Sequence, residues 1–360
     1  MRAFTYETLP MRVVFGPGCC PELAGEVDRL GMQRVLVLCT PQQEHGARRI
    51  ADILGHRAVS VFAGARVHVP IDTAEAAGTA ARAAGVDGCV AVGGGSTIGL
   101  GKALALRDSL PMVAVPTTYA GSEMTPIWGV TEDGVKRTGR NRKVLPRAVV
   151  YDPDLTHSLP VGSSVTSGLN AVAHAVEALY APDLSPIPAL MAEDGVRALV
   201  GALERIVRTP TDPDARTDAL RGSWLCGAAL GSTTMSLHHK LCHVLGGTFD
   251  LPHADVHAVL LPHVVAFNSP AAPEAMAALR RALGVDLHPA SALWQLANRL
   301  GAPTNLATVG MPTEGVADVV RQVLMEPYAN PRPVDGPDLT ALLTRALHGD
   351  GPRPDRGPGT

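Results

Sequence analysis

Two patterns of apolar residues divide the chain near residue 160. Before this point, short runs rich in β-branched residues recur at 34–39, 58–62, 88–92 and 112–115, and segments of helical character such as 73–84 separate them. Short buried strands that alternate with helices are typical of a parallel sheet covered by helices. Residues 1–159 are therefore predicted to form an α/β domain, whose ligands would bind beyond the carboxyl ends of the strands.

The rest of the chain has a helical pattern. Strand-like runs largely disappear, and long segments rich in Ala, Leu and Arg carry apolar residues at helical spacing. We expect helices within 164–180, 187–208, 216–245, 273–283, 290–300 and 313–324. Residues 160–347 are thus predicted to be an all-helical domain, and the Gly- and Pro-rich residues 348–360 a disordered tail.

Composition narrows the class of protein. Hydrophobic residues make up 46% of the 360 residues and charged residues 18%, which supports a large core and excludes wholesale disorder. A formal net charge of -3 argues against sequence-independent nucleic-acid binding. No signal peptide and no apolar run of about 18 residues is visible, so we expect no membrane segment and a cytoplasmic protein. The six cysteines form no C-x-x-C pair, which argues against a disulfide framework or a zinc knuckle.

A glycine-rich loop follows the third predicted strand. Gly93-Gly94-Gly95-Ser96 leads directly into a predicted helix, where backbone amides and the positive helix end favour a phosphate. Two better-known phosphate motifs fail, because Ile98 occupies the last glycine position of G-x-G-x-x-G and Ala103 follows the lysine of a would-be Walker A. A phosphate site is favoured, and a tight turn without a ligand is the alternative. A second polar segment, residues 116–123, follows the next strand. Taken alone, it is predicted to be a surface loop.

A set of polar side chains recurs at helical spacing in the second half. Asn170 and His174 are four residues apart, as are His239 and His243, and His253 follows fourteen residues after His239. One oxygen and three imidazoles would suit a divalent transition metal, but an amide oxygen brings no charge to offset the ion. A lone histidine is more often structural, whereas the shared spacing favours a common site. His238 and His257 fit no place in the set and read as structural or supporting residues.

Together these segments resemble the iron-containing alcohol dehydrogenase superfamily over nearly the whole chain. The resemblance rests on GGGS at 93–96, the TT…GSE segment at 117–123, Tyr151-Asp152-Pro153 and the histidine elements. Within the superfamily it is closest to the branch that reduces maleylacetate, through residues 116–129, 168–182 and 238–253. The implied fold is the dehydroquinate synthase-like fold: an α/β dinucleotide-binding domain, a helical domain, and an active site in the cleft between them.

The resemblance also assigns cofactor contacts. Gly94, Gly95 and Ser96 would hold the pyrophosphate of a nicotinamide dinucleotide. Thr117, Thr118 and Ser122 would line the route to the nicotinamide, and Thr40 would lie near the adenosine ribose, where many NAD-selective relatives carry aspartate. Without that acidic side chain we expect NADH as the main donor, with NADPH also accepted.

The implied activity is the reduction of maleylacetate, or a related enedioate, to 3-oxoadipate during the degradation of aromatic compounds. His243 and His253 would be the principal hydrogen-bond donors, with the pocket shaped by His174, His239 and Asn170. Lys240 and Tyr119 would contact the dicarboxylate substrate. Metal-dependent relatives carry aspartate in place of Asn170, so no metal is expected; if one binds, its ligands would be Asn170, His174, His239 and His253. A homodimer is expected as well.

Other activities stay open at this point. One is a metal-dependent alcohol dehydrogenase in which Asn170 still serves as a ligand. Another is a dehydroquinate-synthase-like cyclase, a lyase that regenerates its cofactor and so consumes no NADH overall. A non-catalytic nucleotide-binding relative is disfavoured by the glycine loop and the histidine set.

Overall fold

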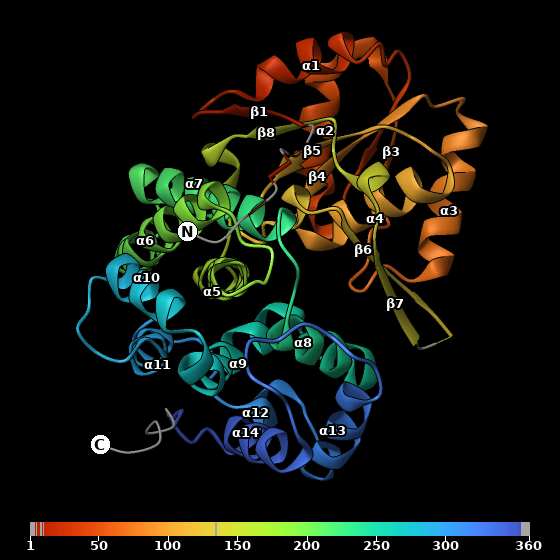
Figure 1. Ribbon diagram of the computed structural model, residues 1–360. Coiled ribbons are helices and arrows are strands. Elements are labelled where there is room, and N and C mark those ends of the chain that lie inside the picture. The colour runs from red at the N-terminus through yellow and green to blue at the C-terminus, as the bar shows by residue number, and fades with distance from the viewer. Residues whose placement is uncertain (1–3, 5, 8, 10, 134, 354–360) are drawn as a thin grey trace. The chain divides into compact units, whose positions relative to one another are not determined.

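The computed structural model describes residues 4, 6, 7, 9, 11–133 and 135–353. It divides into two compact units, one within Thr8–Leu159 and the other consisting mainly of Pro160–Thr360. Figure 1 shows the chain from end to end. Among the described residues, no helix combines the length and the apolar character needed to cross a membrane.

The first unit is built on a six-stranded parallel sheet with the strand order β1-β8-β5-β4-β2-β3. Its strands are β1 (Arg12–Phe15), β2 (Val35–Leu38), β3 (Ala58–Phe62), β4 (Gly88–Gly93), β5 (Met112–Pro116) and β8 (Ala148–Tyr151). This confirms the predicted parallel α/β fold. The sequence analysis missed β1 and β8, which are only four residues long, and the antiparallel hairpin of β6 (Ile127–Glu132) and β7 (Val135–Arg140).

Helices cover both faces of the sheet. Successive side chains of a strand point to opposite faces, so each strand contributes to both cores. Val35 and Val37 of β2 pack in the core under α1 (Leu23–Arg29) and α2 (Glu44–Leu54). Leu36 and Leu38 pack in the opposite core with α3 (Ile71–Ala83) and α4 (Gly95–Arg107). Burial on both faces explains why β2 is a continuous apolar run instead of an alternating one.

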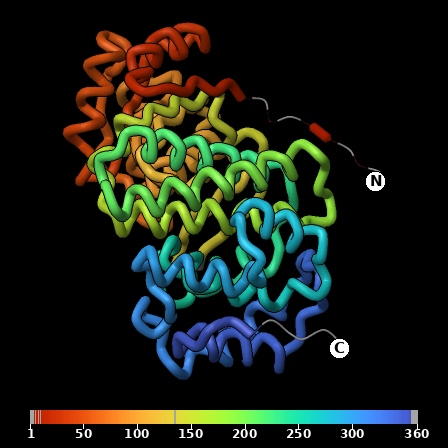
Figure 2. Tube along the Cα trace, turned by 90° about the vertical axis from the view of Figure 1, so that its left-hand side faces the viewer, coloured from red at the N-terminus to blue at the C-terminus, as the bar shows by residue number. Residues whose placement is uncertain are grey.

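In the described part of the second unit, every regular element is a helix. Its helices are α5 (Val161–Leu179), α6 (Pro186–Arg208), α7 (Pro213–Gly231), α8 (Leu237–Phe249), α9 (His253–Asn268), α10 (Pro273–Leu283), α11 (Pro289–Arg299), α12 (Leu306–Val309), α13 (Val316–Leu324) and α14 (Gly336–His348). The long helices α5, α6 and α7 pack side by side, as Figure 2 shows in green.

The predicted helical segment 216–245 is interrupted. α7 ends at Gly231 and α8 begins at Leu237. In the residues between them, the hydroxyls of Ser232 and Thr233 donate to the carbonyls of Ala228 and Ala229, each at 3.0 Å, and so satisfy two carbonyls of the last turn of α7. The break gives α8 its own N-terminus, directly before the histidines.

The predicted disordered tail begins too early. His348 is the last residue of α14, and Pro352 and Arg353 line a pocket described below. Residues 354–360 of the predicted tail lie outside the described part of the chain.

Candidate active site

The sheet order brings three of the predicted cofactor segments to one edge. β2, β4 and β5 are neighbours, so Thr40 after β2, Gly93 at the end of β4 and Thr117 after β5 lie at adjacent carboxyl ends. Gln43 links them: its amide nitrogen donates to Thr117 Oγ1 at 2.8 Å, and its Oε1 accepts from Thr40 Oγ1 at 3.2 Å. The sequence analysis did not single out Gln43, although this residue is only three positions after Thr40.

The glycines of the loop have different roles. Gly93 has a φ of 153°, and a Cβ there would lie 2.5 Å from Thr97 Oγ1 and 2.7 Å from Gln43 Oε1. A Cβ on Gly94 would lie 2.8 Å from the side chain of Thr118. Gly95 opens α4 with nothing within 4 Å of its would-be Cβ. The first two glycines are thus required by close packing, while the third leaves room for a group at the exposed amides of the helix N-terminus.

A buried lysine, Lys102, stabilises the residues that connect β5 to β6. Lys102 Nζ donates to the carbonyls of Ser122 at 2.6 Å, Thr125 at 2.8 Å and Ile127 at 2.7 Å. Ser96, Thr117, Thr118 and Ser122 are half-buried polar residues around this edge. Tyr119 is fully buried, and its hydroxyl donates to Thr156 Oγ1 at 3.2 Å, which argues against the predicted contact of Tyr119 with substrate.

In the helical unit, the predicted histidines do converge. The rings of His174 from α5 and His239 from α8 stack with centroids 5.1 Å apart. The rings of His243 from α8 and His253 from the first turn of α9 stack at 5.9 Å. Asn170 lies one turn before His174 and, like it, is 6% exposed. His243 and His253 are half-buried, so these two are the more accessible members of the cluster.

Glu177 is the main site residue that the sequence analysis missed. It is fully buried and accepts hydrogen bonds from the backbone amides of Ser236 at 2.9 Å and His238 at 2.7 Å, and it lies 2.6 Å from His239 Nδ1. Burial by itself raises the pKa of Glu177, but His239 and these donors outweigh it and lower the pKa below its usual range. Its position three residues after His174, on the same helix face, was the available signal.

His257 and His238 form a second row behind the cluster. His257 Nε2 lies 3.1 Å from His253 Nε2, and His257 Nδ1 lies 2.9 Å from His238 Nε2. Burial lowers the pKa of His238 to about 3 and that of His257 well below the usual range. Both rings are therefore neutral at physiological pH, which fits the supporting role read from the sequence. The thiol of Cys242 lies 3.7 Å from His238 Nε2.

Lys240 lies on the same helix as the histidines but has a different environment. It is half-buried, and its ammonium lies 3.3 Å from the carboxylate of the exposed Glu326. An ion pair with an exposed partner is weak, so this contact can be exchanged for another carboxylate.

Comparisons with known proteins identify the family. Residues 10–153 match the model of iron-containing alcohol dehydrogenases, and residues 164–347 match the C-terminal model of the same family. The chain therefore belongs to the iron-containing alcohol dehydrogenase family. It is 53% identical to a maleylacetate reductase of Burkholderia cepacia, over 98% of this chain and 100% of that protein. It is 54% identical to a maleylacetate reductase of Sphingobium indicum, over 96% and 98% respectively.

Solved structures agree. The crystal structure of a maleylacetate reductase from Agrobacterium tumefaciens superposes with a TM-score of 0.92 at 48% identity, covering 98% of this chain and 100% of that one. A putative alcohol dehydrogenase from Ralstonia eutropha gives a TM-score of 0.96 at 54% identity, with 98% and 100% covered.

The prediction that no metal binds is wrong. Membership in an iron-containing family implies iron or another divalent metal, whereas the prediction rested on the missing charge of Asn170 alone. The residues fit a metal. His239 Nδ1 is engaged by Glu177, and His239 Nε2 is buried with no hydrogen-bond partner among the described residues. A histidine that ligates a metal usually donates a hydrogen bond from one ring N–H group to a carboxylate, and its other ring nitrogen binds the metal.

Proposed function

We propose that the protein is an NAD(P)H-dependent maleylacetate reductase, which reduces maleylacetate to 3-oxoadipate in the degradation of aromatic compounds. The observation that carries this proposal is the 53% identity to a maleylacetate reductase over 98% of this chain. The glycine loop of the first unit suits a dinucleotide, and the histidine cluster of the second unit suits a reacting carbonyl compound.

The chemistry explains which groups are needed. Maleylacetate has a carbon–carbon double bond conjugated to a ketone. Hydride from NADH adds to the alkene carbon farther from the ketone, the electron pair moves onto the ketone oxygen as an enolate, and the neighbouring carbon then takes a proton. The protein must therefore direct hydrogen-bond donors at the ketone oxygen and supply that proton.

We assign these tasks to the half-buried pair of the cluster. His243 and His253 are stacked and accessible, so they are placed to donate to the enolate oxygen and to deliver the proton. Lys240 would bind a substrate carboxylate in exchange for its contact with Glu326.

A divalent metal would be held by Asn170, His174, His239 and His253; with the metal bound, His253 would be a ligand and His243 would remain the donor and proton source. When bound, it would act as a Lewis acid toward a carbonyl oxygen. Glu177 fixes the tautomer of His239 and keeps Nε2 free of its proton for this purpose. Asn170 contributes no negative charge, and the enolate needs less charge stabilisation than a simple alkoxide because its charge is spread over several atoms.

For the cofactor, we assign Gly94, Gly95 and Ser96 to the pyrophosphate and Thr40 to the adenosine ribose. Thr117, Thr118 and Ser122 then lie toward the nicotinamide. The position of Thr40, Gly93 and Thr117 at one sheet edge supports this assignment. We further propose a cytoplasmic homodimer, which rests on the family resemblance.

The decisive experiment measures oxidation of NADH with maleylacetate and, separately, with simple aldehydes. We expect rapid oxidation with maleylacetate, with 3-oxoadipate formed in equal amount, and little with aldehydes. Activity confined to aldehydes would instead indicate an alcohol dehydrogenase. Product formation from a sugar phosphate without net loss of NADH would indicate a cyclase.

A further inference from the structure

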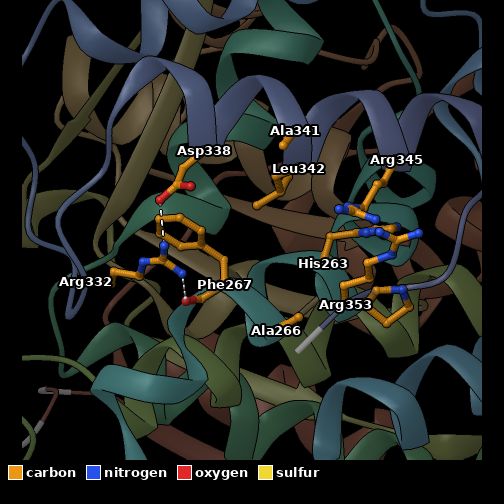
Figure 3. Close-up of a pocket in the computed structure, with 10 residues that line it drawn as sticks. His263, Ala266, Phe267, Arg332, Asp338, Ala341, Leu342, Arg345 and Arg353 are labelled. Carbon is orange, nitrogen blue, oxygen red and sulfur yellow. Dashed lines mark hydrogen bonds and ion pairs between the residues drawn. The ribbon is translucent and has the colours of Figure 1, made fainter. Parts of the chain in front are cut away.

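The helical unit contains a pocket lined by residues outside the histidine cluster. It has a volume of about 580 Å³ and lies between the later turns of α9, α14 and the residues that follow α14. Figure 3 shows its lining residues. This volume is within the range of sites for small organic molecules.

Two arginines, Arg345 and Arg353, bring positive charge to one end of this pocket. At the other end, Arg332 pairs with Asp338 at 2.6 Å and donates to the carbonyl of Phe267 at 3.2 Å, so its charge is committed. Arg345 and Arg353 lie together near His263 in Figure 3. Within the described part of the chain, neither Arg345 nor Arg353 forms a salt bridge.

His263 adds a buried polar atom to the same end. Its side chain is 3% exposed and its ring lies edge-on to Trp294, with centroids 5.7 Å apart. Its Nε2 has no hydrogen-bond partner among the described residues. Burial first, and then Arg345, lower the pKa of His263 to about 4, while Asp350 opposes them, so the ring is neutral at pH 7. Buried polar atoms without a partner are rare in folded proteins, and a ligand is one reason for them.

We propose that this pocket binds a small organic carboxylate. The guanidinium groups of Arg345 and Arg353 recognise the carboxylate, because such groups bind planar anions through paired hydrogen bonds. His263 supplies a further hydrogen bond, and the apolar body of the ligand packs against Phe267 and Leu342. The apolar wall favours an organic acid over inorganic phosphate. The site is separate from the histidine cluster and does not depend on the proposed reductase activity.

The test is a calorimetric titration of the full-length protein, saturated with NADH, with benzoate as the probe. Benzamide serves as its uncharged analogue, and inorganic phosphate as the anion without an apolar body. We expect saturable binding of benzoate and at least about tenfold weaker binding of the other two. Absence of saturable benzoate binding, or equal binding of benzamide, would refute the proposal.

Four variants locate the binding. Arg345→Gln removes the charge, and Ala341→Trp fills the pocket from an exposed position of α14. Each should weaken benzoate binding at least about tenfold without changing thermal stability. Arg321→Gln, at an exposed arginine of α13 outside the pocket, is the matched control and should bind like the wild type. If His243→Ala abolishes benzoate binding while Arg345→Gln leaves it intact, the carboxylate binds in the active site and the proposal fails.

Discussion

At the scale of single residues, the two ring nitrogens of His239 have different environments. One ring nitrogen faces Glu177 at 2.6 Å, and the other is buried with no hydrogen-bond partner in the described part of the chain. The backbone amides of Ser236 and His238 hold the carboxylate in place, so the orientation of His239 depends on the N-terminus of its own helix.

The first prediction concerns His243 and His253, the half-buried members of the histidine cluster. His243→Ala and His253→Ala should each lower kcat by about 100-fold or more, because the first removes a donor to the developing enolate and the second removes a donor or, with the metal bound, a metal ligand. The affinity for NADH should change little, since the glycine loop lies in the other unit. Steady-state kinetics with maleylacetate and fluorescence titration with NADH measure the two effects. His45→Ala, at an exposed position of α2, is the control, and near-normal turnover of either variant would remove that residue from the catalytic groups.

Thr40 gives a prediction about the nucleotide. Its hydroxyl lies 3.2 Å from Gln43 Oε1 and carries no charge that would repel a 2′-phosphate. We expect the wild type to prefer NADH over NADPH by about tenfold, and Thr40→Asp to increase this preference. The measurement is kcat/KM for both donors in both proteins. Strict exclusion of NADPH by the wild type would show that another residue carries the discrimination.

At the scale of elements, the β5–β6 connection depends on a buried amine. Lys102 of α4 donates to three backbone carbonyls between Ser122 and Ile127. Lys102→Met leaves these carbonyls without their donor and should lower the free energy of unfolding by about 2–4 kcal/mol. Urea unfolding measures the change, with Lys143→Met at an exposed position as the control. A variant as stable as the wild type would mean that water replaces the ammonium.

The elements themselves were predictable to different degrees. The runs 34–39, 58–62, 88–92 and 112–115 all form strands of the sheet, because each is an apolar run that contains two valines. β1 and β8 were missed, although each has four residues, as many as β2. The interruption between α7 and α8 was missed because the apolar residues on either side keep helical spacing.

At the scale of the whole molecule, a ligand that binds only the folded protein raises its melting temperature. Removal of the metal with a chelator should therefore lower the melting temperature by about 2–4 °C, and reloading with a divalent metal should restore it. Differential scanning calorimetry measures the shift without reference to activity. His239→Ala should show no shift on reloading, and equal melting of the chelated and reloaded wild type would contradict metal binding.

The sequence by itself determined the fold class and the family, and it predicted histidines that the structure brings together. Burial pattern and helical spacing act over a few residues, so they can be read along the chain; the glycine loop and the pairs Asn170–His174 and His239–His243 are of this kind. Only the tertiary structure decided which groups support them. Gln43 reaches Thr117 across 74 residues and Glu177 reaches His239 across 62, because strand order and helix packing, not sequence spacing, bring these side chains together. The metal was misjudged for a different reason: the missing charge of Asn170 was given more weight than membership in an iron-containing family.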